Sequence, residues 1–165
     1  IHKSKILKLT SPFLEKAVHE SCKIKKAVVQ KDEKEKGLRK ILNFGHSFAH
    51  AYEATLGFSK KLNHGEAVIL GMKTALNFSL KTKLMNKREY YSIIDHIDNS
   101  DLPSSVSKFF SPKDVNKILS FMAKDKKNIS NNINLVLLKK IGTPVINKEY
   151  PKKKIGLFLK IFLRN

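Results

Sequence analysis

Residues 37–57 read GLRKILNFGHSFAHAYEATLG. Apolar residues recur through this stretch at helical spacing, and Gly57 is the residue type that most often follows the end of a helix. We therefore expect one helix over residues 38–56. Its polar residues lie three or four positions apart, so they would form one continuous stripe along the helix: Arg39, Asn43, His46, His50 and Glu53.

The apolar residues of this stretch cover the other faces of the predicted helix, so the polar stripe is not simply its solvent side. Buried polar groups need partners, and a cationic side chain beside two imidazoles is costly unless an anion or a metal ion joins them. The stripe therefore predicts a functional site. The alternative is a surface His-x-x-x-His pair, a spacing that often arises by chance.

A second polar motif, His64-Gly65-Glu66, follows a predicted loop over 58–63 and opens the next helix. A histidine in that position can fold back onto the helix face that carries His46 and His50. Catalytic zinc sites combine three protein ligands with one open position, and neutral imidazoles are frequent ligands. The motif thus predicts a divalent metal site, with Glu66 as a group that orients its ligands. The remaining histidines are expected to be incidental: His2, His19 and His96.

The rest of the chain predicts more helices and one small β ribbon. Ser11-Pro12 supplies an N-cap followed by proline at a first helical position. Capping-box spacing marks two further helix starts, at Asn86 and Ser111. The expected fold class is mainly α, a single multi-helix domain over residues 1–165. Its other elements are helices over 12–31, 65–84, 87–98, 112–123 and 151–163, a connector over 32–37 and a two-stranded ribbon over 133–146.

Composition limits the class of protein. A hydrophobic fraction of 41% with 7 Gly and 5 Pro excludes collagen-like and wholly disordered chains. The apolar run 67–72 is far shorter than the roughly 18 residues that span a bilayer, and no signal-peptide pattern is present. With a single cysteine, Cys22, the sequence favours a soluble cytoplasmic protein. Because the first residue is Ile1, we expect a piece of a longer protein.

The net charge of +19, from 33 basic and 14 acidic residues, raises the question of nucleic-acid binding. Against it, almost all the basic residues are scattered lysines, and aromatic residues make up only 8% of the chain. The abundance of lysine, asparagine and isoleucine is also what an A+T-rich coding sequence produces. Part of the charge remains available for an anionic small-molecule substrate. A basic helical nucleic-acid-binding module therefore stays as the less favoured alternative.

The two histidine stretches, 37–53 and 64–72, resemble 3-dehydroquinate synthase. The resemblance extends upstream to Lys25 and Asp32-Glu33, and downstream through the segment 125–127 to the ribbon, so it covers roughly residues 12–146. It corresponds to the C-terminal, mostly helical domain of that family.

The resemblance implies a reaction for the whole enzyme. The family converts 3-deoxy-arabino-heptulosonate 7-phosphate to 3-dehydroquinate and phosphate in the shikimate pathway, that is, in aromatic amino acid biosynthesis. It is a lyase that uses NAD and a divalent metal, zinc or cobalt, and is expected as a cytoplasmic homodimer. A related sugar-phosphate cyclase, which shares the metal histidines, is the alternative within the same class.

The resemblance also implies a role for each candidate residue. His46 and His64 would be metal ligands, and His50 would hydrogen-bond the substrate and serve in proton transfer. The groups that would hold the substrate's carboxylate, hydroxyls and phosphate are Lys25, Arg39, Asn43 and Lys126.

Two departures from the family pattern limit what the chain is expected to do alone. Ala49 stands where the family usually has glycine between the helical histidines. More seriously, the family's third metal ligand, a glutamate, and its NAD-binding N-terminal domain both precede the segment matched here. No G-x-G-x-x-G motif occurs in the chain. We therefore expect an inactive isolated chain whose apolar surface around Leu7, Leu9 and Phe13 is exposed for the missing domain to cover.

Overall fold

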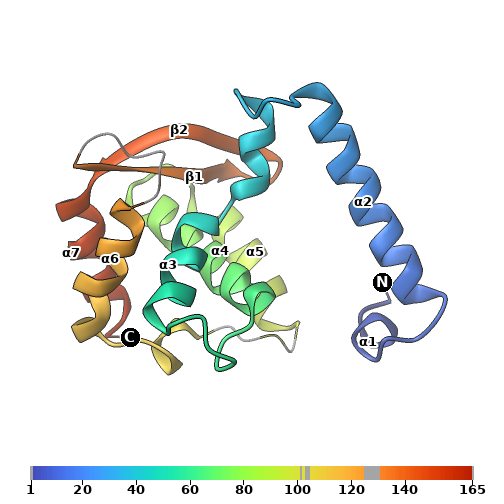
Figure 1. The fold of residues 1–165 in the computed structure, drawn as a ribbon, viewed down its shortest axis with the longest axis horizontal. Coiled ribbons are helices and arrows are strands. Elements are labelled where there is room, and N and C mark those ends of the chain that lie inside the picture. The colour runs from blue at the N-terminus through green and yellow to red at the C-terminus, as the bar shows by residue number, and fades with distance from the viewer. Residues whose placement is uncertain (1, 101, 103–104, 125–130, 165) are drawn as a thin grey trace. The chain divides into compact units, whose positions relative to one another are not determined.

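The structure is a computed structural model that describes residues 2–100, 102, 105–124 and 131–164 (Figure 1). The chain divides into two compact units, Ile1–Leu42 and Asn43–Asn165. Within the described residues, no helix combines the length and apolarity that crossing a membrane requires. The elements in chain order are α1 (Lys3–Leu7), α2 (Phe13–Lys31), η1 (Leu38–Asn43), α3 (His46–Thr55), α4 (His64–Lys81), α5 (Lys87–Asp98), η2 (Val106–Lys108), η3 (Pro112–Asp114), α6 (Val115–Ala123), β1 (Asn132–Lys140), β2 (Thr143–Pro151) and α7 (Lys152–Phe162).

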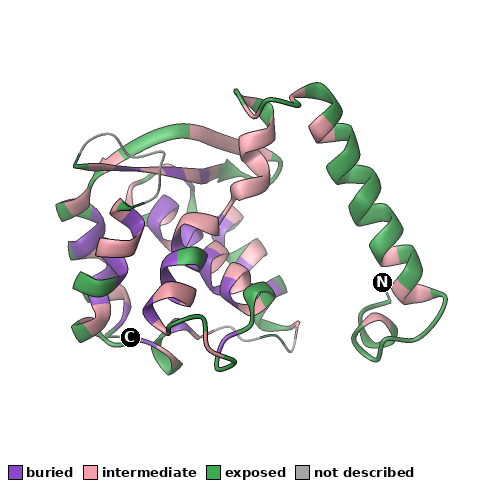
Figure 2. Cartoon of the chain, viewed as in Figure 1, coloured by how far each residue is buried: buried purple, intermediate pink, exposed green. Residues whose placement is uncertain are grey.

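The first unit is held by local contacts. Among residues 2–42 none is buried (Figure 2). The aromatic ring of Phe13 is covered only in part, by the His2 ring at 4.7 Å and the Lys5 ammonium at 4.3 Å. Leu7 and Leu9 are 46% and 71% exposed, which confirms the expected apolar exposure at these two positions. The short helix α1 was not expected from the sequence.

The second unit contains the hydrophobic core. Helices α3, α4, α6 and α7 and strand β1 contribute to one cluster of buried residues, and α5 packs on the end of α4 through a second cluster around Leu76 and Met85. The largest fully buried side chains include Tyr52, Phe48 and Phe78. Figure 2 shows this burial along the inner sides of the helices.

The two strands form one antiparallel hairpin that lies along one side of the helices of this unit (Figure 1). Strand β1 alternates, with Ile133, Leu135 and Leu137 buried, as a half-buried strand requires. The mainly α class with a two-stranded ribbon is therefore confirmed. The ribbon is longer than the predicted 133–146, because the polar residues that follow Ile146 continue the pairing as far as Pro151.

The prediction of one helix over 38–56 is wrong. The segment is a 3₁₀ helix, η1, followed by α3, and Gly45 separates the two with φ = +81°, a left-handed conformation that ends a helical run. Arg39 therefore does not share a helix with His46, and the polar stripe is not continuous. Elsewhere the helix predicted over 87–98 is confirmed as α5, and the Asn86 side chain caps it by accepting from the Glu89 backbone N–H.

Candidate active site

Helices α3 and α4 approach each other closely because two glycines face each other at their crossing. A Cβ atom built on Gly71 would lie 2.3 Å from the Gly45 carbonyl oxygen and 2.9 Å from the Ala49 backbone nitrogen. A Cβ on Gly45 would lie 2.6 Å from the Met72 backbone nitrogen. Only residues without side chains fit here. The contact sets the separation of the helix segments that carry the histidines.

Three imidazoles meet at the start of these two helices. His46 is the first residue of α3, His50 follows one turn later, and His64 is the first residue of α4. The ring centroids are 5.5 Å apart for His46 and His50, 5.9 Å for His46 and His64, and 6.1 Å for His50 and His64. We call these three residues the histidine triangle.

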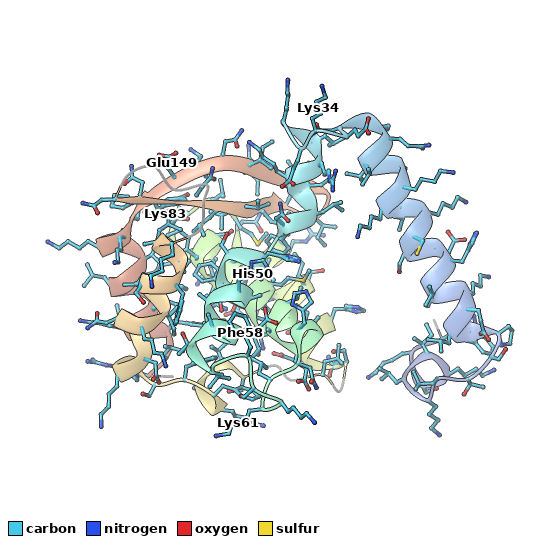
Figure 3. The ribbon with its side chains drawn as sticks, in the orientation of Figure 1. Lys34, His50, Phe58, Lys61, Lys83 and Glu149 are labelled. Carbon is cyan, nitrogen blue, oxygen red and sulfur yellow. The ribbon has the colours of Figure 1, made fainter. Side chains whose placement is uncertain are left out.

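The histidine triangle lies at the surface of the chain. His46 is partly buried, whereas His50 and His64 are exposed, and Figure 3 labels His50 on α3. The stripe is therefore not enclosed as expected: His50 is exposed, and the stripe's other residues are partly buried, namely Arg39, Asn43, His46 and Glu53. Burial lowers the pKa of His46 from its ordinary value, and the neighbouring imidazoles act in the same direction. The neutral form of His46, the form that can bind a metal, is thereby favoured.

Two of the three rings have their Nδ1 atom beside an acceptor. His46 Nδ1 lies 3.4 Å from the Phe44 carbonyl oxygen, and His64 Nδ1 lies 3.1 and 3.2 Å from the two carboxylate oxygens of Glu53. A carbonyl or an ionised carboxylate only accepts, so each contact requires the proton on Nδ1. In the neutral rings of His46 and His64, the Nε2 lone pair is then the one left for a ligand.

Glu66, which the sequence suggested as an orienting group, caps a helix in the structure. Its carboxylate accepts the Asn63 backbone N–H at 2.8 Å and forms a capping box at the start of α4. Glu53 takes the place beside His64 instead. The Asn63-x-x-Glu66 spacing could have indicated the capping role, and the position of Glu53 three residues after His50 could have indicated a shared face.

The donor set for a metal ion is incomplete in the described part of the chain. Two imidazole rings 5.9 Å apart are compatible with Nε2 bonds of about 2.0–2.1 Å to one ion. However, no group of three His, Cys, Asp or Glu side chains among the described residues is arranged to hold a metal. The described residues therefore offer two suitable nitrogens, and a complete site needs a further ligand.

The other candidate residues are distributed between the two units. Asn43 precedes His46 in the second unit and is partly buried. Lys25, exposed on α2, and Arg39, on η1, belong to the first unit. Lys126 lies outside the described residues. The structure thus brings His46, His50 and His64 together, and describes Lys25 and Arg39 in a separate unit.

Arg39 is held by a turn that Asp32 organises. The Asp32 carboxylate accepts three backbone N–H groups, from Lys36 at 2.9 Å, Gly37 at 2.7 Å and Arg39 at 2.9 Å. These bonds, that of Arg39 first, lower the pKa of Asp32 below its ordinary value. The Arg39 guanidinium in turn donates to the Glu33 carbonyl at 2.7 Å. The cationic side chain is therefore anchored at one of its nitrogens.

A family model and two similar proteins carry the same name, 3-dehydroquinate synthase. The family model described as 3-dehydroquinate synthase C-terminal matches residues 2–128. A 3-dehydroquinate synthase from Pelagibacter ubique is 60% identical over 156 residues, which cover 94% of this chain and 42% of that protein. One from Endomicrobium trichonymphae is 42% identical over 129 residues, covering 78% of this chain and 34% of that protein. The chain thus spans about two fifths or less of the length of these relatives.

Solved structures share the fold at lower identity. A 2-deoxy-scyllo-inosose synthase complexed with carbaglucose-6-phosphate, NAD⁺ and Co²⁺ matches with a TM-score of 0.76 and 22% identity, over 93% of this chain and 42% of that one. A 2-epi-5-epi-valiolone synthase from Streptomyces hygroscopicus with NAD⁺ and Zn²⁺ bound matches with a TM-score of 0.71 and 22% identity, over 99% of this chain and 44% of that one. At this identity the likeness is one of fold.

Proposed function

Because the chain belongs to the 3-dehydroquinate synthase C-terminal family, we propose that it is the metal- and substrate-binding part of a 3-dehydroquinate synthase. The whole enzyme converts 3-deoxy-arabino-heptulosonate 7-phosphate to 3-dehydroquinate and phosphate, as a cytoplasmic homodimer. The observation that carries the proposal is the histidine triangle, in which the Nδ1 atoms of His46 and His64 each lie beside an acceptor and the two rings are 5.9 Å apart.

His46 and His64 hold a divalent metal ion, zinc or cobalt, in this proposal. Their ring spacing of 5.9 Å supports it, as does the anchoring of both Nδ1 atoms. Groups beyond these two imidazoles complete the coordination, in keeping with the incomplete donor set of the described residues. When bound, such an ion acts as a Lewis acid on a substrate oxygen. NAD is assigned to an N-terminal domain of the whole enzyme.

The third imidazole, His50, is assigned to proton transfer. It is exposed, and its ring lies within 6.1 Å of both proposed ligand rings, so it can hydrogen-bond a substrate that the ion holds. A histidine is suited to this role because its ordinary pKa lies near neutral pH.

Binding of the substrate's anionic groups is assigned to cationic and amide side chains. Arg39 is prepared for this role in the structure, because Asp32 and the Glu33 carbonyl fix its backbone and one guanidinium nitrogen. Arginine suits a carboxylate or phosphate through paired N–H donors. The other groups of this proposal are Lys25, Asn43 and Lys126.

Product identification tests the proposal. We would join this chain to the N-terminal region of the Pelagibacter ubique relative and supply 3-deoxy-arabino-heptulosonate 7-phosphate, NAD⁺ and Zn²⁺. The expected product by mass spectrometry is 3-dehydroquinate, and His50→Ala should lower kcat about 100-fold or more. His96→Ala, at an exposed position on α5, is the matched control and should leave the rate unchanged.

Two results would contradict this function. No turnover by a folded, metal-loaded fusion would argue against it, as would turnover of a different sugar phosphate in preference to this substrate. The second result would favour a related sugar-phosphate cyclase, the class to which the two solved structures belong by their names.

A further inference from the structure

We propose that Glu53 is a positioning residue for His64: its carboxylate accepts the Nδ1 proton and so holds the ring with Nε2 directed to the metal ion. This inference rests on the proposed function, because it concerns the metal site assigned there. It starts from the contacts of 3.1 and 3.2 Å between His64 Nδ1 and the two carboxylate oxygens.

The exposure of the two side chains indicates that Glu53 orients His64 and not the reverse. The Glu53 side chain is 13% exposed, whereas that of His64 is 60% exposed. Glu53 stands on α3, whose neighbouring residues Ala51 and Tyr52 are buried in the core. The carboxylate therefore belongs to a well-packed helix, and the exposed ring is the partner that it orients.

His46 shows the same arrangement with a different acceptor. The Phe44 carbonyl stands beside its Nδ1 as Glu53 stands beside that of His64. Histidines that bind metals usually donate their other N–H to a carboxylate or a carbonyl, which fixes the ring orientation and raises the basicity of the ligand nitrogen. Both proposed ligands of this chain thus have such a partner, and the partner of His64 is the charged one.

The chain also contains a second histidine–glutamate pair, which is more exposed than His64 and Glu53. His19 Nδ1 lies 3.4 Å from a carboxylate oxygen of Glu20, and these side chains are 74% and 51% exposed. Pairs in solvent contribute little, because both side chains stay free and water screens them. If contact with a carboxylate were enough to orient a ring, Glu20 would orient His19 as well. The inference requires that Glu53 fixes the tautomer of His64 and that Glu20 does not fix that of His19.

The test measures the tautomers directly. Long-range ¹H–¹⁵N NMR of the imidazoles in the 165-residue chain, without metal and above pH 8, should show His64 in the Nδ1–H form. Glu53→Ala should move it toward the Nε2–H form. Glu53→Gln should retain part of the effect, since its amide oxygen still accepts. Glu20→Ala should leave the tautomer of His19 unchanged.

Zinc affinity, measured by titration with Zn²⁺ alone, is the second readout. Glu53→Ala should weaken binding about 10- to 100-fold, and Glu53→Gln by less. Glu20→Ala should have no effect. An unchanged His64 tautomer in folded Glu53→Ala overturns the inference even where zinc binding depends on His46. Zinc binding that is absent, or insensitive to His46→Ala, overturns the metal assignment itself.

Discussion

Helices α2 and α4 are nearly equal in length, 19 and 18 residues, yet they differ completely in burial. No residue of α2 is buried, and Val18 and Ile24 are 54% and 63% exposed. Helix α4 has eight buried residues, small ones among them, which allow α3 to approach it. Helical spacing is present in both sequences, so it predicts that a helix forms and does not predict what the helix packs against. We expect the stability of the chain to reside in the second unit.

The largest difference in stability is expected between alanine variants of two isoleucines, one from each unit. Ile118 on α6 is fully buried, and Ile24 on α2 is 63% exposed. Ile118→Ala should lower the free energy of unfolding by about 2–5 kcal/mol, because it removes buried methyl groups and leaves a cavity. Ile24→Ala should change it by less than about 0.5 kcal/mol. Urea unfolding followed by circular dichroism measures both. Equal effects would mean that α2 is as well packed as the core.

The second prediction concerns two glycines of the same helix, α4. Gly71→Ala places a methyl group against the backbone of Gly45 and Ala49, so the helices must separate, and we expect a loss of about 1–3 kcal/mol. Gly65→Ala meets nothing within 4 Å and should be neutral or stabilising by at most about 1 kcal/mol. Thermal unfolding of the two variants compares them. A Gly71→Ala variant as stable as the parent would contradict the close crossing.

These glycines also show which features of the fold could not be predicted from the sequence. The motif residues 37–57 and 64–72 were enough to place three histidines near one another, and the helical spacing along the whole chain predicted the mainly α class. The periodicity did not reveal that Gly45 is left-handed, nor that Met72, far along the chain, comes so close that no Cβ atom fits at Gly45. The helix 87–98 was predicted to the residue, because its cap, Asn86, is local. Glu53 was missed as the partner of His64 since their contact depends on how α3 and α4 cross.

A smaller loss of stability is expected when a buried hydroxyl group is removed. Tyr52 on α3 is fully buried, and its hydroxyl lies 2.8 Å from that of Thr74, which itself donates to the Leu70 carbonyl. Burial raises the pKa of Tyr52 well above its ordinary value. Tyr52→Phe should cost about 1 kcal/mol in urea unfolding. Tyr91→Phe, at a 53% exposed tyrosine on α5, is the control and should cost nothing measurable. An equal cost for both would contradict the buried hydrogen bond.

The smallest effect on overall stability is expected in the first unit, at Asp32. Its carboxylate organises the turn before Arg39, so Asp32→Ala should speed amide hydrogen exchange at Lys36, Gly37 and Arg39 while hardly changing the unfolding of the core. Backbone donors lower the pKa of Asp32 below its ordinary 3.8. The native turn is therefore favoured above pH 3.8 and loses this support as the pH falls through the lowered pKa.

The neighbouring acid provides the control for this last prediction. Glu33→Gln leaves the Glu33 carbonyl, which accepts from the Arg39 guanidinium, in place, so exchange at the three amides should not change. In a pH series, protection of these amides, corrected for intrinsic exchange, should decline in the parent chain only below pH 3.8. Protection that is retained in Asp32→Ala would show that the 3₁₀ helix η1 holds the turn without the carboxylate. The local order of the first unit would then come from its backbone, as the order of the second comes from its core.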